Sequence, residues 1–166
     1  MGAFANSIRA FALKKKADHD AVVRKVVFDL STKVIKASPV DTGRFRANWQ
    51  YGYGVKPEGT LDAVDLSSDG SSTRDDIAGQ VTKGAGVHYL VNNLPYAEVL
   101  EYGYYPDPPK YGTYLKKGVS KHGYTGPGYM QRSAGGFSKQ APRGMVGISV
   151  MDVANDLQRI AQEVTP

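Results

Sequence analysis

Apolar side chains recur every three or four residues between Asp18 and Ala37. The positions that form this stripe are Val23, Val26, Val27, Leu30, Val34 and Ala37. Such spacing places the side chains on one face of an α-helix. Asp18 is a suitable residue to cap the start of the helix, and Pro39 ends it because a residue before proline avoids helical backbone angles. The pattern predicts a helix over residues 18–37.

A second pattern, with a period of two, follows Gly43. Aromatic and apolar residues occupy one set of positions, namely Phe45, Ala47, Trp49, Tyr51 and Tyr53. Polar residues occupy the alternate set, namely Arg44, Arg46, Asn48 and Gln50. This alternation is typical of a strand with one face in the core and the other in solvent. We therefore predict a half-buried strand over residues 45–53.

The middle of the chain is mostly polar. Residues 54–79 are rich in Ser, Asp and Gly and have too little apolar surface to offset the entropy lost on ordering, which predicts a long mobile loop. Extended segments are predicted next around 77–83 and 87–92, paired as a hairpin that turns at 83–86. Pro95 can then open a short helix that Gly103 closes.

The last third of the chain predicts a loop and a helix. Residues 104–128 are dense in Tyr, Pro, Gly and Lys, which favours a second long loop. An apolar stripe then predicts a C-terminal amphipathic helix through Val150, Val153, Ala154, Leu157, Ile160, Ala161 and Val164. The fold class we expect is α+β, in one domain over residues 1–166. A small antiparallel sheet is flanked by a long N-terminal helix and a C-terminal helix, with two long loops.

Composition and charge narrow the possible functions. The chain of 166 residues contains no cysteine, which excludes disulfides and thiol chemistry. Its longest apolar runs are too short to span a bilayer, and the N-terminal charges follow the apolar residues, unlike those of a signal peptide. The net charge of +5 is uneven, since residues 56–76 carry −4 and the rest of the chain +9. Such a dipolar surface suits nucleic-acid binding or head-to-tail packing of identical subunits.

The tripeptide Asp41-Thr42-Gly43 raises the question of catalysis, because the same tripeptide carries the catalytic aspartate of aspartic proteases. Those enzymes need two carboxylates that share one proton, so a single copy per chain would require a homodimer. Arg44 beside the dyad would keep Asp41 ionised and oppose proton sharing. A turn, in which Asp41 accepts backbone hydrogen bonds and Gly43 supplies a positive φ, is the favoured interpretation. An aspartic-type hydrolase that uses Asp41 is the least favoured alternative.

Other chemistry has little support in the sequence. His19, His88 and His122 lack the spacing of metal ligands, so we expect no metal. The sequence shows no triad spacing and no phosphate-binding loop, so an enzyme is the weaker class, and we expect no cofactor and no enzymatic activity. Basic residues interleaved with tyrosines could instead grip phosphates and stack on bases, which makes a nucleic-acid-binding module the main alternative function. The basic residues concerned are Lys14, Lys15, Lys16, Arg44, Arg46, Lys116, Lys117 and Lys121.

Three segments together resemble a known family. They are SPVDTGRFRANW at 38–49, LPYAEVLEYG at 94–103 and GPGYMQRSA at 126–134. In this order, between a long N-terminal helix and a C-terminal helix, they resemble the neck and tail-completion proteins of long-tailed bacteriophages. The residues that match the first two motifs are Pro39, Asp41, Thr42, Gly43, Arg44, Trp49, Tyr96, Ala97, Glu98, Glu101, Tyr102 and Gly103.

The resemblance implies a structural protein of the virion without catalytic activity. It would be made in the host bacterial cytoplasm and would join head and tail at their junction, with no contact to a membrane. It would form a ring, sixfold or twelvefold, around the DNA passage, and contact other neck, connector and tail proteins. Lys116, Lys117 and Lys121 could touch DNA in the lumen, although an acidic lining from residues 62–76 is as plausible.

The same resemblance suggests a role for several motif residues. Asp41 and Gly43 would fix the angle between helix and strand, and Trp49 would anchor the core. Tyr96 and Tyr102 would pack near the end of the sheet. Glu101 would pair with Arg44 or Arg46.

Overall fold

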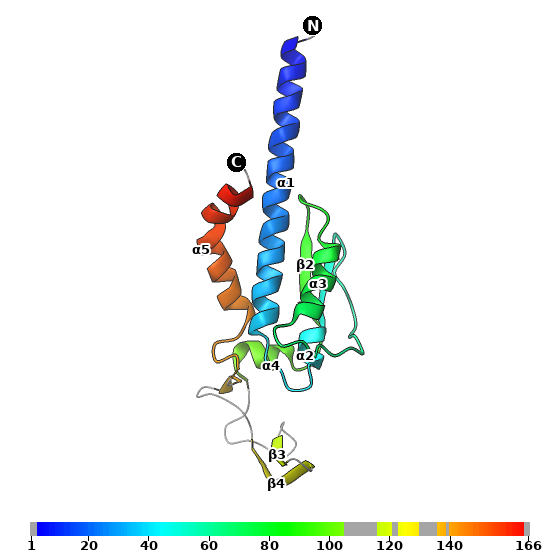
Figure 1. The fold of residues 1–166 in the computed structure, drawn as a ribbon, viewed down its shortest axis with the longest axis vertical. Coiled ribbons are helices and arrows are strands. Elements are labelled where there is room, and N and C mark those ends of the chain that lie inside the picture. Colours follow the sequence, from blue (N-terminus) through cyan, green and yellow to red (C-terminus); the bar gives the residue numbers. More distant parts are fainter. Residues whose placement is uncertain (1–2, 105–115, 121–122, 130–135, 139, 165–166) are drawn as a thin grey trace.

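The computed structural model describes residues 3–104, 116–120, 123–129, 136–138 and 140–164 (Figure 1). The chain has an α+β fold. A 35-residue helix, α1, spans Ala3–Ala37, and the C-terminal helix α5, Val146–Val164, packs along its second half. The remaining described elements are the helices α2 Arg44–Ala47, α3 Ser71–Gln80 and α4 Ala97–Tyr102, and the strands β1 Trp49–Tyr53, β2 His88–Asn92, β3 Lys116–Ser120 and β4 Gly123–Tyr129.

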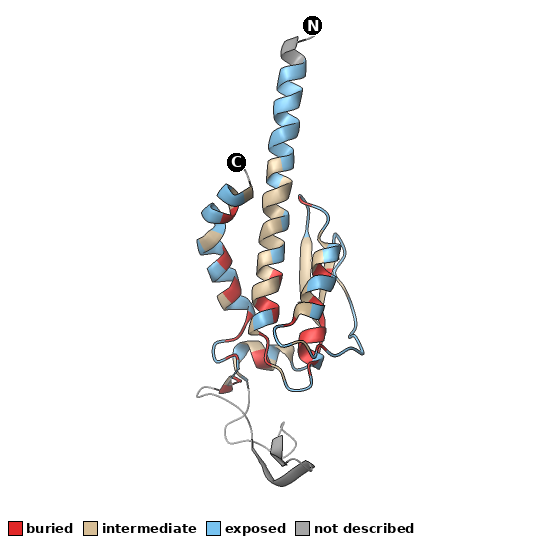
Figure 2. Ribbon diagram, viewed as in Figure 1, coloured by how far each residue is buried: buried red, intermediate tan, exposed pale blue. Residues whose placement is uncertain are grey.

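The strands β1 and β2 form a two-stranded antiparallel sheet beside α1, on the side away from α5 (Figure 1). Trp49 lies opposite Asn92 and Tyr53 lies opposite His88. The helix α3 packs against both α1 and β1. Because α1 contacts α5 on one side and α3 on another, its second half is covered on two faces (Figure 2).

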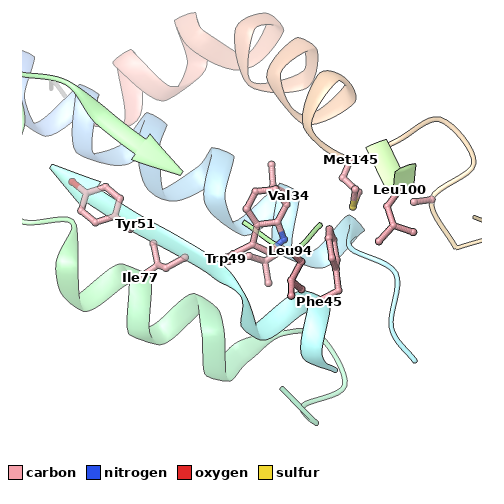
Figure 3. Close-up of a cluster of buried hydrophobic side chains, with 10 residues drawn as sticks. Val34, Phe45, Trp49, Tyr51, Ile77, Leu94, Leu100 and Met145 are labelled. Atoms are coloured by element: carbon pink, nitrogen blue, oxygen red, sulfur yellow. The ribbon is translucent and has the colours of Figure 1, made fainter. Parts of the chain in front are cut away.

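The hydrophobic core lies where these elements meet the end of α1 (Figure 3). Aromatic side chains from α2 and β1 fill its centre, and Trp49 is only 7% exposed. The other members come from four helices, from β1 and from the segments before α4 and α5, and they are Val34, Ile35, Phe45, Tyr51, Ile77, Leu94, Leu100, Ala141 and Met145. The helices α1, α2, α3 and α4 and the strand β1 each contribute one or two of these residues, and Leu90 of β2 packs against them while partly buried. Within the described part of the chain, no helix is both long and apolar enough to cross a bilayer.

The N-terminal helix begins earlier than its apolar stripe predicted. Helix α1 starts at Ala3, so Asp18 lies inside it and does not cap its start. Residues 3–17 contain neither Gly nor Pro, and ten of the fifteen are Ala, Lys, Leu or Arg, which are strong helix formers. Asp18 is accommodated in the helix, where its carboxylate lies 3.7 Å from the ammonium group of Lys15. The predicted end before Pro39 is confirmed.

The predicted strand over 45–53 is correct only in its second half. Residues 44–47 form the short helix α2, and β1 begins at Trp49. Gly43 has a φ of +84° and its carbonyl accepts the N–H of Ala47 at 3.0 Å, which closes the first helical turn. The alternating pattern predicted that Arg46 faces solvent. In the structure Phe45, Arg46 and Ala47 are all buried, so the pattern does not describe this segment.

The two predicted long loops and the hairpin at 83–86 are wrong in part. Residues 71–80 form the helix α3, so the extended segment predicted at 77–83 begins as a helix. The strand predicted at 87–92 exists as β2, but it pairs with β1 instead of with 77–83. In the second predicted loop, residues 116–120 and 123–129 pair as the antiparallel strands β3 and β4. The C-terminal helix and the short helix that ends at Gly103 are confirmed.

Candidate interaction site

The first motif begins where α1 ends, and it is tied to the sheet by hydrogen bonds of Ser38. The Ser38 hydroxyl donates to the carbonyl of Val34 at 2.8 Å and accepts the indole N–H of Trp49 at 2.8 Å. Pro39 is buried beside it. A buried indole N–H needs an acceptor, so Ser38 satisfies Trp49 and fixes the position of β1 relative to the end of the helix.

Gly43 is required at the corner for two separate reasons. Its φ of +84° is in the left-handed region, which favours glycine. In addition, the backbone of Asp65 lies directly on it, with the N–H of Asp65 donating to the Gly43 carbonyl at 3.1 Å. A Cβ at Gly43 would lie 2.3 Å from the carbonyl oxygen of Asp65. The glycine of the tripeptide is therefore the place where a distant segment of the chain docks.

Asp65 is a buried carboxylate, 1% exposed, that organises this distant segment. It accepts the N–H groups of Ser67 and Thr73, each at 3.0 Å, and the hydroxyl groups of the same two residues. Burial opposes ionisation of the carboxyl group, but these four hydrogen bonds outweigh it and lower the pKa of Asp65 to about 2. The carboxylate joins the polar segment to the start of α3.

Residues 54–70 are held in place by amide side chains that bond to their backbone. Asn48, which is fully buried, donates to the Leu61 carbonyl at 3.0 Å and accepts the Leu61 N–H at 2.7 Å. Asn93 donates to the carbonyls of Pro57 and Gly59 at 3.2 and 2.9 Å. These contacts take the place of an apolar core in the segment. Residues 54–70 form the predicted loop, and the prediction for 54–79 is wrong only over 71–79, which belong to α3.

Arg46 belongs to the same framework and is not available to a ligand. Its guanidinium is buried and donates to the Ser67 carbonyl at 2.9 Å. Arg44, in contrast, is exposed. The predicted pairing of Glu101 with one of these arginines is wrong, because Glu101 binds elsewhere.

The second motif joins α4 to α5 through Glu101. Its carboxylate accepts the N–H groups of Met145, Val146 and Gly147 at 2.7, 2.9 and 2.9 Å. These are free N–H groups at the start of α5, where the helix dipole also favours a negative charge. Glu101 thus acts as an N-terminal cap supplied by another helix.

The glycine and tyrosines of the second motif surround this junction. Gly103 ends α4 with a φ of +73°, and the ring of Phe137 lies where its Cβ would be. Tyr96 packs against Phe45 with ring centroids 6.0 Å apart, and Tyr102 packs against Tyr104 at 5.7 Å. Both motif tyrosines are exposed in part, so they lie at the surface of the core and not inside it.

The two motifs meet in an open hollow of about 150 Å³. Its lining residues are Phe45, Trp49, Asn92, Ala97, Glu98, Glu101, Tyr102, Met145 and Val146. The floor is therefore aromatic and apolar, and the exposed carboxylate of Glu98 is at the rim. A hollow of this size can accept one side chain of another protein.

Neither Asp41 nor Thr42 lines this hollow. Asp41 and Thr42 are exposed at the corner. Lys116 and Lys117 are in β3, and Lys121 is outside the described residues. Among the residues that the structure describes, no three His, Asp or Glu side chains are placed to hold a metal ion.

The sequence pointed to Gly43, Trp49 and Glu101, but it did not reveal Asp65 or the partners of Glu101. Asp65 lies in a stretch of acidic residues, and Asp69 has the same spacing to a serine, so the sequence does not mark Asp65 as the buried carboxylate that binds Ser67 and Thr73. Glu101 was singled out, but its partners are more than forty residues away. Comparison of the chain with protein families, with curated proteins and with solved structures gave no match.

Proposed function

We propose that the chain is a structural subunit of the head–tail junction of a long-tailed bacteriophage, assembled as a ring around the DNA passage. The observation that carries the proposal is the order of the motifs SPVDTGRFRANW and LPYAEVLEYG between two long helices. Residues of these motifs stabilise the fold. The backbone of Asp65 packs on Gly43, Trp49 packs in the core and Glu101 caps α5.

The distribution of surface residues also supports a role in assembly. Large apolar side chains are exposed on ordered parts of the chain, including Leu66 at 82% and Phe11 at 64%. Exposed apolar residues that gather into one contiguous patch are typical of protein–protein contacts, whereas scattered single ones are not. Several of these residues are close in sequence, such as Val64 and Leu66, which is compatible with a surface that becomes covered on assembly.

Native mass spectrometry of the purified protein over a concentration series, with negative-stain images of the largest species, tests the proposal. A closed ring, sixfold or twelvefold, is the expected result. A subunit that stays monomeric, or that stops at a dimer, at every concentration contradicts it.

A further inference from the structure

The first half of α1 extends beyond the rest of the molecule. The turn before β2 reaches α1 at Asp20, whose carboxylate accepts the N–H of Ala85 at 2.9 Å. Before that point the helix continues alone, and residues 6–17 are all exposed (Figure 2). We name residues 3–17 the projecting half of α1. At 1.5 Å per residue it is about 22 Å long.

The side chains of the projecting half suit a protein partner. Ile8 and Phe11 are three residues apart and therefore share one face of the helix, and both are exposed. Lys14 and Lys16 border this face on either side, as the helical repeat of 3.6 residues requires. The projecting half has four basic residues and no acidic one. Lys15 lies on the same face, with its ammonium nitrogen 5.8 Å from the centre of the Phe11 ring, yet Ile8 and Phe11 stay 55% and 64% exposed in the single chain.

A complementary surface lies on the acidic segment, which we define as residues 56–76. The buried carboxylate of Asp65 turns inward, and its neighbours Val64 and Leu66 are exposed. Leu61 is also exposed, and the carboxylates of Glu58 and Asp62 lie beside these residues in the sequence, both exposed. Exposed apolar side chains and negative charge thus occur on the same short stretch of chain, whose backbone is held by hydrogen bonds from Asn48 and Asn93.

The two surfaces cannot meet within one chain. The helix α1 is continuous from Ala3 to Ala37, with no Gly or Pro at which it could fold back. The acidic segment lies beside the second half of α1, where α3 packs on it. The projecting half points away from that region (Figure 1). A contact between them therefore needs a second copy.

We infer that the projecting half of α1 docks on the acidic segment of a second copy of the chain, with Ile8 and Phe11 against Leu61, Val64 and Leu66. Two projecting halves would repel each other, because each carries +4. Docking of the projecting half on the acidic segment joins two different surfaces. Each subunit can therefore bind one neighbour through its projecting half and a second neighbour through its acidic segment. The inference names the contact between subunits in the proposed ring. It rests on the proposed function only for the statement that successive contacts close into a ring.

Charge reversal in the full-length protein tests the contact. The helix variant is Lys14→Glu with Lys16→Glu, and Lys15 is kept because it pairs with Asp18. The segment variant is Glu58→Lys with Asp62→Lys. The control is Lys36→Glu with Lys83→Glu, which makes the same charge change as the helix variant at exposed positions outside both surfaces. Circular dichroism and Trp49 fluorescence check that each variant is folded.

We expect each of the two test variants to raise the concentration needed for assembly at least tenfold in sedimentation velocity, and the control to change it less than twofold. An equimolar mixture of the helix variant and the segment variant should assemble again. In that mixture, each reversed helix meets a reversed segment and each unchanged helix meets an unchanged one. Native mass spectra should then show equal numbers of the two variants in each assembly.

The outcomes separate the inference from the proposed function. If the wild type forms a ring and both variants form it equally well, the inference is overturned and the ring proposal stands. The same holds if the wild type forms a ring and the mixture of variants fails to assemble. A wild-type dimer that depends on these charges supports the contact and contradicts the ring, and a monomer at every concentration contradicts both. Loss of duplex DNA retention in the helix variant, with assembly unchanged, would identify the projecting half as a nucleic-acid contact and overturn the inference.

Discussion

Asp65 determines how a polar segment becomes ordered without a core of its own. Four donors from Ser67 and Thr73 surround its carboxylate, and its own backbone rests on Gly43. A buried carboxylate of this kind stabilises the fold only while it is ionised. Two residues, one acidic and one without a side chain, therefore fix the position of the segment, and each can be tested.

We predict that Asp65→Asn lowers the free energy of unfolding at pH 7. The variant should also lose less of this free energy than the wild type when the pH is lowered. The pKa of Asp65 is lowered from 3.8 to about 2, so its stabilisation is present above pH 3.8 and is lost as the pH falls through 2. A shift of this size corresponds to about 2 kcal/mol. Urea unfolding at pH 7 and at pH 2.5 measures both effects. Asp75→Asn, at an exposed position, is the control and should leave both quantities nearly unchanged.

Gly43→Ala tests the corner against a matched glycine. The added Cβ would lie 2.3 Å from the Asp65 carbonyl oxygen, whereas at Gly54, which also has a positive φ of +72°, no heavy atom lies within 4 Å of it. We expect Gly54→Ala to cost about 1 kcal/mol for the backbone angle alone and Gly43→Ala to cost about 2–4 kcal/mol. Equal urea midpoints for the two variants would show that the Asp65 backbone does not press on Gly43.

At the scale of elements, the junction of α4 and α5 depends on one side chain. Glu101→Ala removes the acceptor for three N–H groups at the start of α5. We expect a loss of about 1–2 kcal/mol in the free energy of unfolding, and Glu101→Gln should fall between this variant and the wild type. Thermal unfolding followed by circular dichroism measures both. Glu98→Ala, an exposed change in the same short helix, should have little effect, and a loss as large as that of Glu101→Ala would argue against the cap.

The elements that could be predicted from the sequence are those whose pattern is local. The apolar stripe of α5 and the stop before Pro39 depend on neighbouring residues, and both are correct. The helix α3 has only Thr73 and Ile77 buried among ten residues, so it has no stripe to detect. The sheet was assigned to adjacent segments, yet β1 pairs with β2 across the whole acidic segment. Pairing between distant residues has no periodic signal, and the same is true of Glu101 at the candidate site.

At the scale of the whole molecule, the projecting half of α1 can be removed without disturbing the rest of the described chain, which we call the body. The core lies around the end of α1, and residues 6–17 are exposed. Removal of residues 2–17 should therefore leave the thermal midpoint, followed by Trp49 fluorescence, within a few degrees of the wild-type value. Native mass spectrometry of the same truncated protein should show monomers. A large loss of thermal stability would mean that this half supports the body and is not mainly a contact surface.

The way in which the acidic segment is held has a consequence for how this surface can change during evolution. Asn48 and Asn93 bond to backbone groups of Pro57, Gly59 and Leu61, and not to their side chains. Side chains on the segment can therefore be replaced without altering its path, provided that Asp65 and the residues that hold it are retained. Related chains should vary most on the segment itself and least at the positions that grip it, so that a partner preference can diverge while the fold stays constant.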